Sequence, residues 1–226
     1  MKTLIIGAGE IGKSLCVVLS EEYRVTLIDK DGLGYPDSFE MIHICFPYSE
    51  NFIQQVKEYK ERFNPKYVVI HSTVPVGTSS QCNAWHSPVI GIHPNLENGL
   101  KTFDKFLGGK NVKELIDYFR KGGIKIYPVD KPEYTELMKL CCTTYFGTCI
   151  EYTKEVKRLC KKNNVPFELW TVWNNNYNRG YKLLNEEQFV RPNLFPLKES
   201  IGGHCVLPNL ELFESKFTKL LKELNK

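Results

Sequence analysis

The stretch that decides the fold is TLIIGAGEIG, residues 3–12, together with the residues that follow it up to Asp29. The apolar run at 3–6 predicts a strand, and apolar residues recur at helical spacing over 13–20. A second apolar run, at 24–28, predicts another strand, and this one ends in Asp29. The order of strand, glycine-rich turn, helix, strand and acid is typical of a dinucleotide-binding unit.

Each glycine of this turn has a physical role in the predicted unit. Gly7 permits the tight turn, Gly9 lets the backbone approach a pyrophosphate, and Gly12 allows close packing of the helix on the strand. The N-terminus of the helix supplies unpaired N–H groups and a partial positive charge for the phosphates. We therefore expect a dinucleotide to bind along the turn, at Gly7, Gly9, Glu10, Ile11 and Gly12.

The acid at the end of the second strand indicates which nucleotide binds. Asp29 is placed to accept hydrogen bonds from an adenosine ribose, and its charge would repel a 2′-phosphate. NAD is therefore favoured over NADP as the cofactor, with Lys30 beside Asp29 in the same site. The alternative is a strand–helix–strand turn that binds nothing.

The alternation of strand and helix patterns continues beyond this unit. Strands are expected at 41–46, 67–71, 89–92 and 124–127, and helices at 49–63 and 112–121. This order predicts an α/β fold with a Rossmann-type, doubly wound, mostly parallel sheet. Ligands of such sheets lie beyond the carboxyl ends of the strands. We therefore add Phe46, Pro47, Ser72 and Thr73 to the expected cofactor site.

A long helical pattern follows the sheet region. Asp130 can cap it, Pro132 suits its first turn, and it continues to about Lys162. Roughly 30 residues of helix span about 45 Å, which favours a structural spine or a dimer contact. Further helices are expected at 167–185 and 210–224. We divide the chain into a NAD-binding Rossmann domain, residues 1–130, and a helical central domain, residues 131–226.

The composition is that of a folded globular protein. The chain has 226 residues, 42% of them hydrophobic and 25% charged, and its 13 Phe and 12 Tyr are spread without low-complexity tracts. This excludes a disordered chain. No apolar run approaches the ~18 residues of a membrane span, and Gly7, Gly9 and Glu10 interrupt the first run before a secretory signal could form.

The charge of the chain limits which classes of partner we expect, and its cysteine content indicates the cellular compartment. The formal net charge of +4 arises entirely after residue 130, which is compatible with an anionic substrate and too weak for nucleic-acid binding. The eight cysteines form no C-x-x-C pair, and Cys141 and Cys142 are adjacent, so we expect a reducing cytoplasm. The histidines do not pair with cysteines at ligand spacing, and we expect no metal site.

Five motifs in this order resemble the UDP-glucose/GDP-mannose dehydrogenase family, whose members use two NAD to oxidise the primary alcohol of a nucleotide sugar to a carboxylate. The motifs are the turn at 7–12, STVPVGT at 72–78, the glycine pair at 108–109, ELMKL at 136–140 and GGHC at 202–205. The match extends over nearly the whole chain. It implies a Rossmann domain, a long central helix and NAD as the cofactor.

The resemblance also implies catalytic roles for individual residues. Cys205 corresponds to the family's nucleophile, which adds to an aldehyde as a thiohemiacetal. Lys139 matches the catalytic lysine, whose ammonium stabilises developing oxyanions. Thr73 resembles the threonine near the nicotinamide, which helps to order a water or the substrate.

Three of the expected catalytic positions depart from the family pattern. Thr143 stands where the family usually has asparagine, Asn95 where it often has glutamate, and Asn209 where it has aspartate. Asparagine cannot accept a proton at neutral pH, so the general bases for water attack on a thioester are lost. His93 and His204 are imaginable replacements. We then expect that oxidation stops at the aldehyde or that the thioester hydrolyses slowly.

The chain is also shorter than the family pattern, since no segment resembles the family's C-terminal nucleotide-sugar-binding domain. The leading hypothesis is an NAD-dependent oxidoreductase acting on the primary alcohol or aldehyde of a sugar-like or other small anionic substrate. One alternative is a catalytically degenerate NAD-binding regulatory or scaffold subunit. Another is a two-electron hydroxyacid-type dehydrogenase that relies on Lys139 and does not use Cys205.

The long helix predicts the quaternary structure as well. A chain of this size leaves the apolar stripe of the helix at 132–162 poorly covered. We therefore expect a homodimer that forms through this helix, with no membrane and no nucleic acid among the partners.

Overall fold

The computed structural model describes residues 1–29, 38–91, 94–196 and 206–225. The chain divides into two compact units, Met1–Lys139 and Leu140–Lys226, and the division falls inside the long helix α6 (Pro132–Lys162). The first unit contains the sheet, and the second is helical. Lys30, His93 and the expected nucleophile Cys205 lie outside the described residues.

Seven strands form one sheet in the first unit, in the order β2-β1-β3-β4-β5-β6-β7. They are β1 (Thr3–Ile6), β2 (Val25–Ile28), β3 (Met41–Ile44), β4 (Tyr67–Ile70), β5 (Trp85–His86), β6 (Lys105–Gly108) and β7 (Ile126–Val129). Neighbouring strands are parallel except β5 and β6. The order reverses between β1 and β3, at the topological switch point where doubly wound sheets bind ligands. The predicted Rossmann-type sheet is confirmed.

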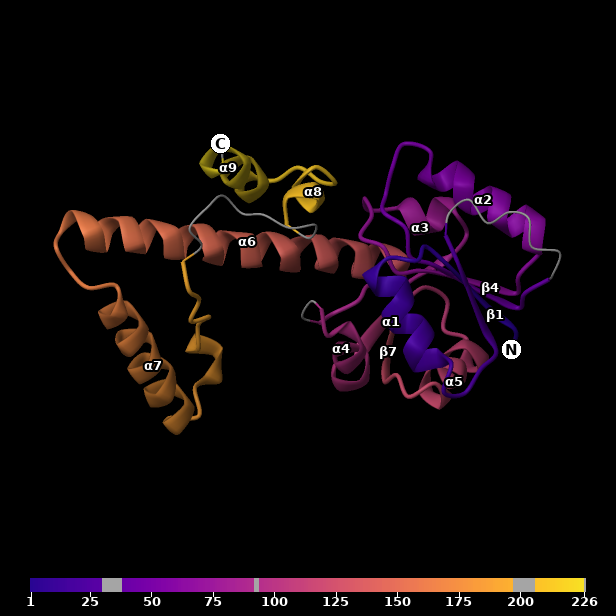
Figure 1. Ribbon diagram of the computed structural model, residues 1–226, viewed down its shortest axis with the longest axis horizontal. Coiled ribbons are helices and arrows are strands. Elements are labelled where there is room, and N and C mark those ends of the chain that lie inside the picture. The colour runs from indigo at the N-terminus through magenta and orange to yellow at the C-terminus, as the bar shows by residue number, and fades with distance from the viewer. Residues whose placement is uncertain (30–37, 92–93, 197–205, 226) are drawn as a thin grey trace. The chain divides into compact units, whose positions relative to one another are not determined.

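Helices cover both faces of the sheet (Figure 1). Helices α1 (Glu10–Leu19), α4 (Leu96–Thr102) and α5 (Lys113–Lys121) pack on one face, and α2 (Phe52–Phe63) and the short α3 (Thr78–Gln81) lie on the other. Strand side chains alternate between the two resulting cores, as the two-residue period of a strand requires. Ile5 joins the core with α1 and α5, whereas Leu4 and Ile6 join the core with α2.

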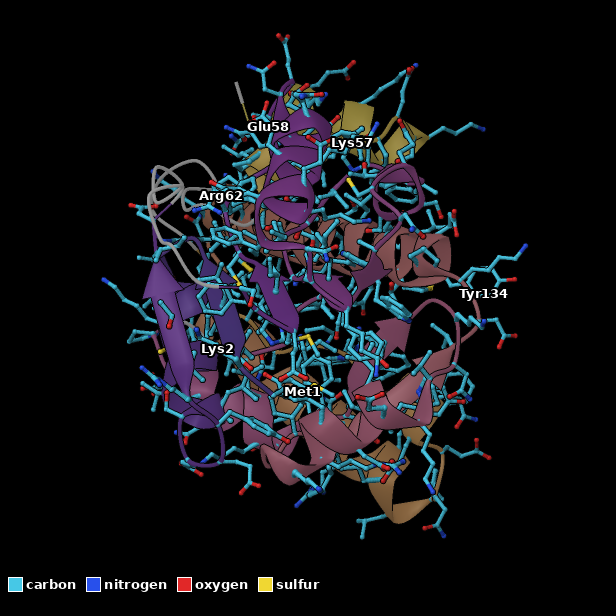
Figure 2. All side chains as sticks on the ribbon, turned by 90° about the vertical axis from the view of Figure 1, so that its right-hand side faces the viewer. Met1, Lys2, Lys57, Glu58, Arg62 and Tyr134 are labelled. Carbon is cyan, nitrogen blue, oxygen red and sulfur yellow. The ribbon has the colours of Figure 1, made fainter. Side chains whose placement is uncertain are left out.

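Helix α2 shows how the sequence pattern produces this layering. Its buried side chains recur at helical spacing and pack into one core: Phe52, Val56, Tyr59 and Phe63. Lys57, Glu58 and Arg62 are exposed and project to the solvent side of the helix (Figure 2). An apolar stripe on one side of a helix is buried in this way because it removes the most apolar area from water.

The second unit is built from helices. The 31-residue helix α6 has the bounds that the sequence predicts, and α7 (Glu168–Leu183) follows it. The prediction of a single helix at 210–224 is wrong, because the structure has α8 (Leu207–Leu210) and a separate α9 (Lys216–Leu224). A capping box between Ser215 and Thr218 starts α9 anew. Within the described residues, no helix is both long and apolar enough to cross a membrane.

The strand expected at 89–92 is also wrong. Its described part, residues 89–91, lies outside any strand, and the fifth strand is the two-residue β5, which ends at His86. The carbonyl groups that follow β5 accept hydrogen bonds from lysine side chains, and Pro88 has no N–H to donate to a neighbouring strand. The sheet continues with β6, which the sequence pattern did not predict.

Candidate cofactor and catalytic site

The turn between β1 and α1 has the geometry of a phosphate-binding loop. Gly7 has a φ of 107°, and a Cβ there would lie 2.7 Å from the backbone of Cys45 and Phe46, at the end of β3. A Cβ on Gly12 would lie 1.9 Å from the Gly7 carbonyl oxygen. A Cβ on Gly9 would meet nothing within 4 Å, so space is open where a pyrophosphate would approach. This turn therefore fits a dinucleotide.

The remaining residues of the expected nucleotide site lie at the same edge of the sheet. Glu10 and Ile11 form the first turn of α1, with Glu10 exposed. Asp29 directly follows β2 and is exposed, and the Gly7 N–H donates to the Ile28 carbonyl beside it, at 2.9 Å. An exposed carboxylate next to the glycine turn fits the position of the acid that contacts a ribose hydroxyl in dinucleotide-binding units.

The loops after β3 and β4 differ in which side chains they expose. The Phe46 ring is buried and packs with its centroid 5.0 Å from that of Phe52, so it is a core residue. The Ser72 hydroxyl is buried and donates to the Phe46 carbonyl at 2.5 Å, which ties the two loops together. Pro47 is exposed and Thr73 is half-buried. A ligand at this edge can therefore reach Pro47 and Thr73.

A buried carboxylate from α6 holds the loop that carries Thr73. Glu136 has no exposed surface, and its two oxygens accept hydrogen bonds from the N–H groups of Gly77, at 2.6 Å, and Ser79, at 2.8 Å. Burial raises the pKa of Glu136, and these N–H donors oppose the rise. The sequence places Glu136 in the ELMKL motif and on one helix face with Lys139 and Thr143, but it does not indicate that the carboxylate holds this loop.

His86 links the same loop to α6 from within the sheet. Its Nε2 donates to the Ser72 carbonyl at 3.1 Å, so its Nδ1 accepts from the Thr135 hydroxyl at 2.7 Å. Burial lowers the pKa of His86 to about 3, and the ring is therefore neutral at physiological pH. The positions of α6 and of the loop after β4 are thus coupled by two independent buried contacts.

The expected catalytic Lys139 lies at the carboxyl end of β5. Its ammonium donates to the Val89 carbonyl at 2.8 Å, and its side chain is half-buried. The neighbouring carbonyls of Ser87 and Pro88 accept from Lys105, at 2.6 and 3.0 Å. The Lys105 and Lys139 side chains therefore bind three consecutive carbonyls. The sequence pattern did not predict this arrangement.

The remaining expected catalytic residues, apart from Thr73, are divided between the two units and the part of the chain that is not described. Asn95 belongs to that unit but is exposed at the start of α4, where its side chain makes no capping bond. Thr143, on α6, and Asn209, on α8, are buried and belong to the second unit. Cys205 lies outside the described residues.

Solved structures share this fold. The UDP-D-ManNAc dehydrogenase of Pyrococcus horikoshii matches 100% of this chain and 68% of its own, with a TM-score of 0.76 at 15% sequence identity. The fold is that of the nucleotide-sugar dehydrogenases. The UDP-N-acetyl-mannosamine dehydrogenase Cap5O of Staphylococcus aureus matches with a TM-score of 0.73 at 15% identity, over 100% of this chain and 67% of its own. The resemblance to the UDP-glucose/GDP-mannose dehydrogenase family is thus confirmed at the level of the fold.

A smaller enzyme also shares the fold. The 3-hydroxyisobutyrate dehydrogenase of Mycobacterium tuberculosis matches with a TM-score of 0.70 at 10% identity, and the match covers 98% of this chain and 91% of that one. No family model and no curated protein matches the sequence. The likeness to these structures therefore lies in the fold of the backbone.

Proposed function

We propose that this chain is an NAD-dependent dehydrogenase that oxidises a CH–OH group of a sugar-like or other small anionic substrate. The observation that carries this proposal is the open glycine turn at the switch point, on the same sheet edge as the Lys139 ammonium. The fold shared with the nucleotide-sugar dehydrogenases supports it. The substrate's charge would complement the basic excess after residue 130.

The residues at the carboxyl edge of the sheet would have different roles in the oxidation of an alcohol. The turn at 7–12 would hold the NAD pyrophosphate and Asp29 its ribose, and NAD would supply the acceptor for the hydride. The ammonium of Lys139 would stabilise the negative charge that develops on the substrate oxygen as its proton leaves. The hydroxyl of the half-buried Thr73 would orient the substrate or a water.

A second oxidation step would use Cys205, by its resemblance to the family's nucleophile. Its thiolate would add to the aldehyde carbon, a hydride would leave to a second NAD, and water would release the acid from the thioester. Asn209 and Asn95 lack a carboxylate that could activate this water. We therefore expect slow acid formation, and a Cys205→Ser variant should form no acid through this route.

The direct test has two stages. Calorimetric titration should show that NAD binds more tightly than NADP, and Asp29→Ala should reduce this preference because it removes the charge that repels a 2′-phosphate. NADH formation is then followed with nucleotide sugars, sugar phosphates and hydroxy acids. Tight NAD binding without turnover of any of them, together with a Cys205 that iodoacetamide does not label, would identify a non-catalytic subunit instead.

A two-electron hydroxyacid dehydrogenase is the second candidate. It is favoured by the 91% coverage of the 3-hydroxyisobutyrate dehydrogenase, because that match accounts for nearly the whole length of both chains. Such an enzyme would need Lys139 and not Cys205. Full activity of Cys205→Ser on a hydroxy acid, with loss of activity in Lys139→Met, would favour this candidate over the first.

We also propose that the protein is a homodimer that assembles through α6. Large side chains on the second-unit part of this helix are exposed: Tyr145 and Tyr152 at 61% and Phe146 at 48%. Exposed apolar side chains on one helix are typical of a protein interface. Light scattering at micromolar concentration should give twice the chain mass, and Tyr145→Glu with Tyr152→Glu should give a monomer. Substitution of the exposed Lys57 and Glu58 is the matched control.

A further inference from the structure

Lys105, the first residue of β6, carries a buried amine, and burial lowers its pKa to about 7. Its side chain is 3% exposed, and its ammonium donates to the carbonyls of Ser87 and Pro88. Among the described residues, the titratable groups that affect the pKa of Lys105 are Cys45 and Lys139, and neither is a carboxylate. A buried ammonium without a carboxylate partner is costly, so its contacts with the backbone must offset part of that cost.

The titratable groups that face Lys105 come from four elements. They are His43 on β3, Cys45 after β3, His71 after β4, His86 on β5 and Lys139 on α6. Burial lowers the pKa of His43 and of His86 to about 3, and it lowers the pKa of His71 as well. Burial raises the pKa of Cys45 to about 12. At neutral pH these four groups are uncharged, and Lys139 is the charged neighbour.

Hydrogen bonds fix the carbonyl that Lys105 shares with His71. The His71 Nδ1 must donate to the Ser87 carbonyl, at 2.8 Å, so its Nε2 accepts from the His43 Nδ1 at 2.9 Å. The His43 Nε2 then accepts from the Tyr118 hydroxyl at 3.1 Å. The same logic makes the Tyr118 oxygen the acceptor of the Thr3 hydroxyl, at 3.0 Å. A continuous buried chain from β1 therefore ends on the Ser87 carbonyl.

These contacts determine the orientation of the carbonyl groups that follow β5. The Ser87 carbonyl receives two donors and the Pro88 carbonyl one, all from inside the first unit. The next carbonyl, that of Val89, receives the Lys139 ammonium. We propose that Lys105 is a positioning residue for Lys139: it holds the backbone from Ser87 to Val89 so that the Val89 carbonyl anchors the Lys139 ammonium. This inference rests on the proposed function for its catalytic consequence, but not for the coupling between the two lysines.

The coupling is measured on the protein itself, without substrate. NMR of isotopically labelled lysine side chains follows the titration of Lys105, whose signal is assigned by its loss in Lys105→Arg. Burial, reinforced by the charge of Lys139, lowers the pKa of Lys105 to about 7. Lys139→Met should raise this pKa, and Lys139→Arg, which keeps the charge, should not. Equal pKa values of Lys105 in the two variants would overturn the proposal.

The catalytic consequence is measured by kinetics. Lys105→Met should lower kcat about tenfold to a hundredfold, because misplacement of a reacting group by ~1 Å has effects of this size. The Kd for NAD should stay unchanged, since the glycine turn lies at β1. Lys105→Arg, which keeps the charge and the donors, should recover part of kcat. Lys101→Met is the matched control, because Lys101 is exposed and paired with Glu21.

The outcomes separate this proposal from the proposed function. Parallel losses of kcat and NAD affinity in Lys105→Met, or a normal kcat, would contradict a positioning role. If Lys105→Met does not fold, Lys105→Arg and the NMR titration still decide the question. If no substrate is turned over by the unaltered protein, the dehydrogenase proposal fails, while the predicted coupling of Lys105 to Lys139 is still confirmed or contradicted by NMR.

Discussion

Gly9 and Gly12 belong to one motif, but a methyl group at the two positions meets different surroundings. At Gly9 it would point into open space, and at Gly12 it would lie within 1.9 Å of the Gly7 carbonyl oxygen. We predict that Gly9→Ala leaves the melting temperature nearly unchanged but weakens NAD binding at least tenfold, because the methyl group occupies the space of the pyrophosphate. Gly12→Ala should unfold the protein at markedly lower temperature, because overpacking costs about 1–3 kcal/mol or more.

Calorimetry with NAD and thermal melts of both variants check this pair. Gly180→Ala is the control, since a Cβ at Gly180, on α7, meets nothing within 4 Å. This control should not lose stability and should bind NAD normally. Normal NAD affinity in Gly9→Ala would place the dinucleotide elsewhere.

At the scale of elements, α3 depends on a carboxylate from another helix. Glu136 accepts the N–H groups of Gly77 and Ser79 at the start of α3. In Glu136→Gln one of these N–H groups would face an amide NH₂ and lose its acceptor. We predict a loss of about 1–3 kcal/mol in the free energy of unfolding, the cost of leaving a buried donor unpaired.

Chemical denaturation measures this loss, and Glu133→Gln provides the comparison. Glu133 lies one turn earlier on α6 and accepts from the exposed Ser80 hydroxyl, so its neutralisation should cost less than about 1 kcal/mol. Equal losses in the two variants would show that burial of Glu136 does not decide the outcome.

A helix or strand could be predicted from the sequence where the residues that determine it are neighbours in the chain. Helix α6 follows from its own apolar spacing and from Pro132 in the first turn, and its bounds are confirmed. The strand expected at 89–92 was wrong because an apolar run does not reveal whether its backbone groups pair with another strand. Here Lys105 and Lys139, distant in sequence, take the carbonyls of this segment.

At the scale of the whole molecule, three buried histidines make stability depend on pH. The pKa values of His43 and His86 are lowered to about 3, and that of His71 is also lowered. Between the ordinary histidine pKa of about 6.5 and pH 3 the unfolded chain therefore binds more protons than the folded one. We predict that stability falls as the pH falls through this window, by up to about 1.4 kcal/mol per pH unit for each histidine.

Urea denaturation at a series of pH values measures this slope. His86→Gln should reduce the slope by the equivalent of one proton, whatever its effect on stability at neutral pH. A slope unchanged by the substitution would mean that His86 already titrates normally in the folded protein.

Lys105 gives a second pH dependence, with its window on the alkaline side. Burial, reinforced by the charge of Lys139, lowers its pKa to about 7, below the ordinary lysine value of 10.5. Between these pH values the unfolded chain keeps a proton that the folded chain has lost, so stability should rise with pH. In Lys105→Met this rise in stability should be absent. Urea denaturation across the same pH range measures it, and a rise that persists in the variant would contradict the prediction.

The sequence by itself determined the features that depend on neighbouring residues. The glycine spacing at 7–12 and Asp29 indicated a dinucleotide turn, the alternation of patterns indicated a doubly wound sheet, and the apolar period after Pro132 indicated the long helix. Only the tertiary structure decided how Glu136 caps α3 and how Lys105 and Lys139 share one loop. The physical reason is that these contacts join residues far apart in the chain, and only the order of the strands together with the packing of the first turns of α6 brings them together.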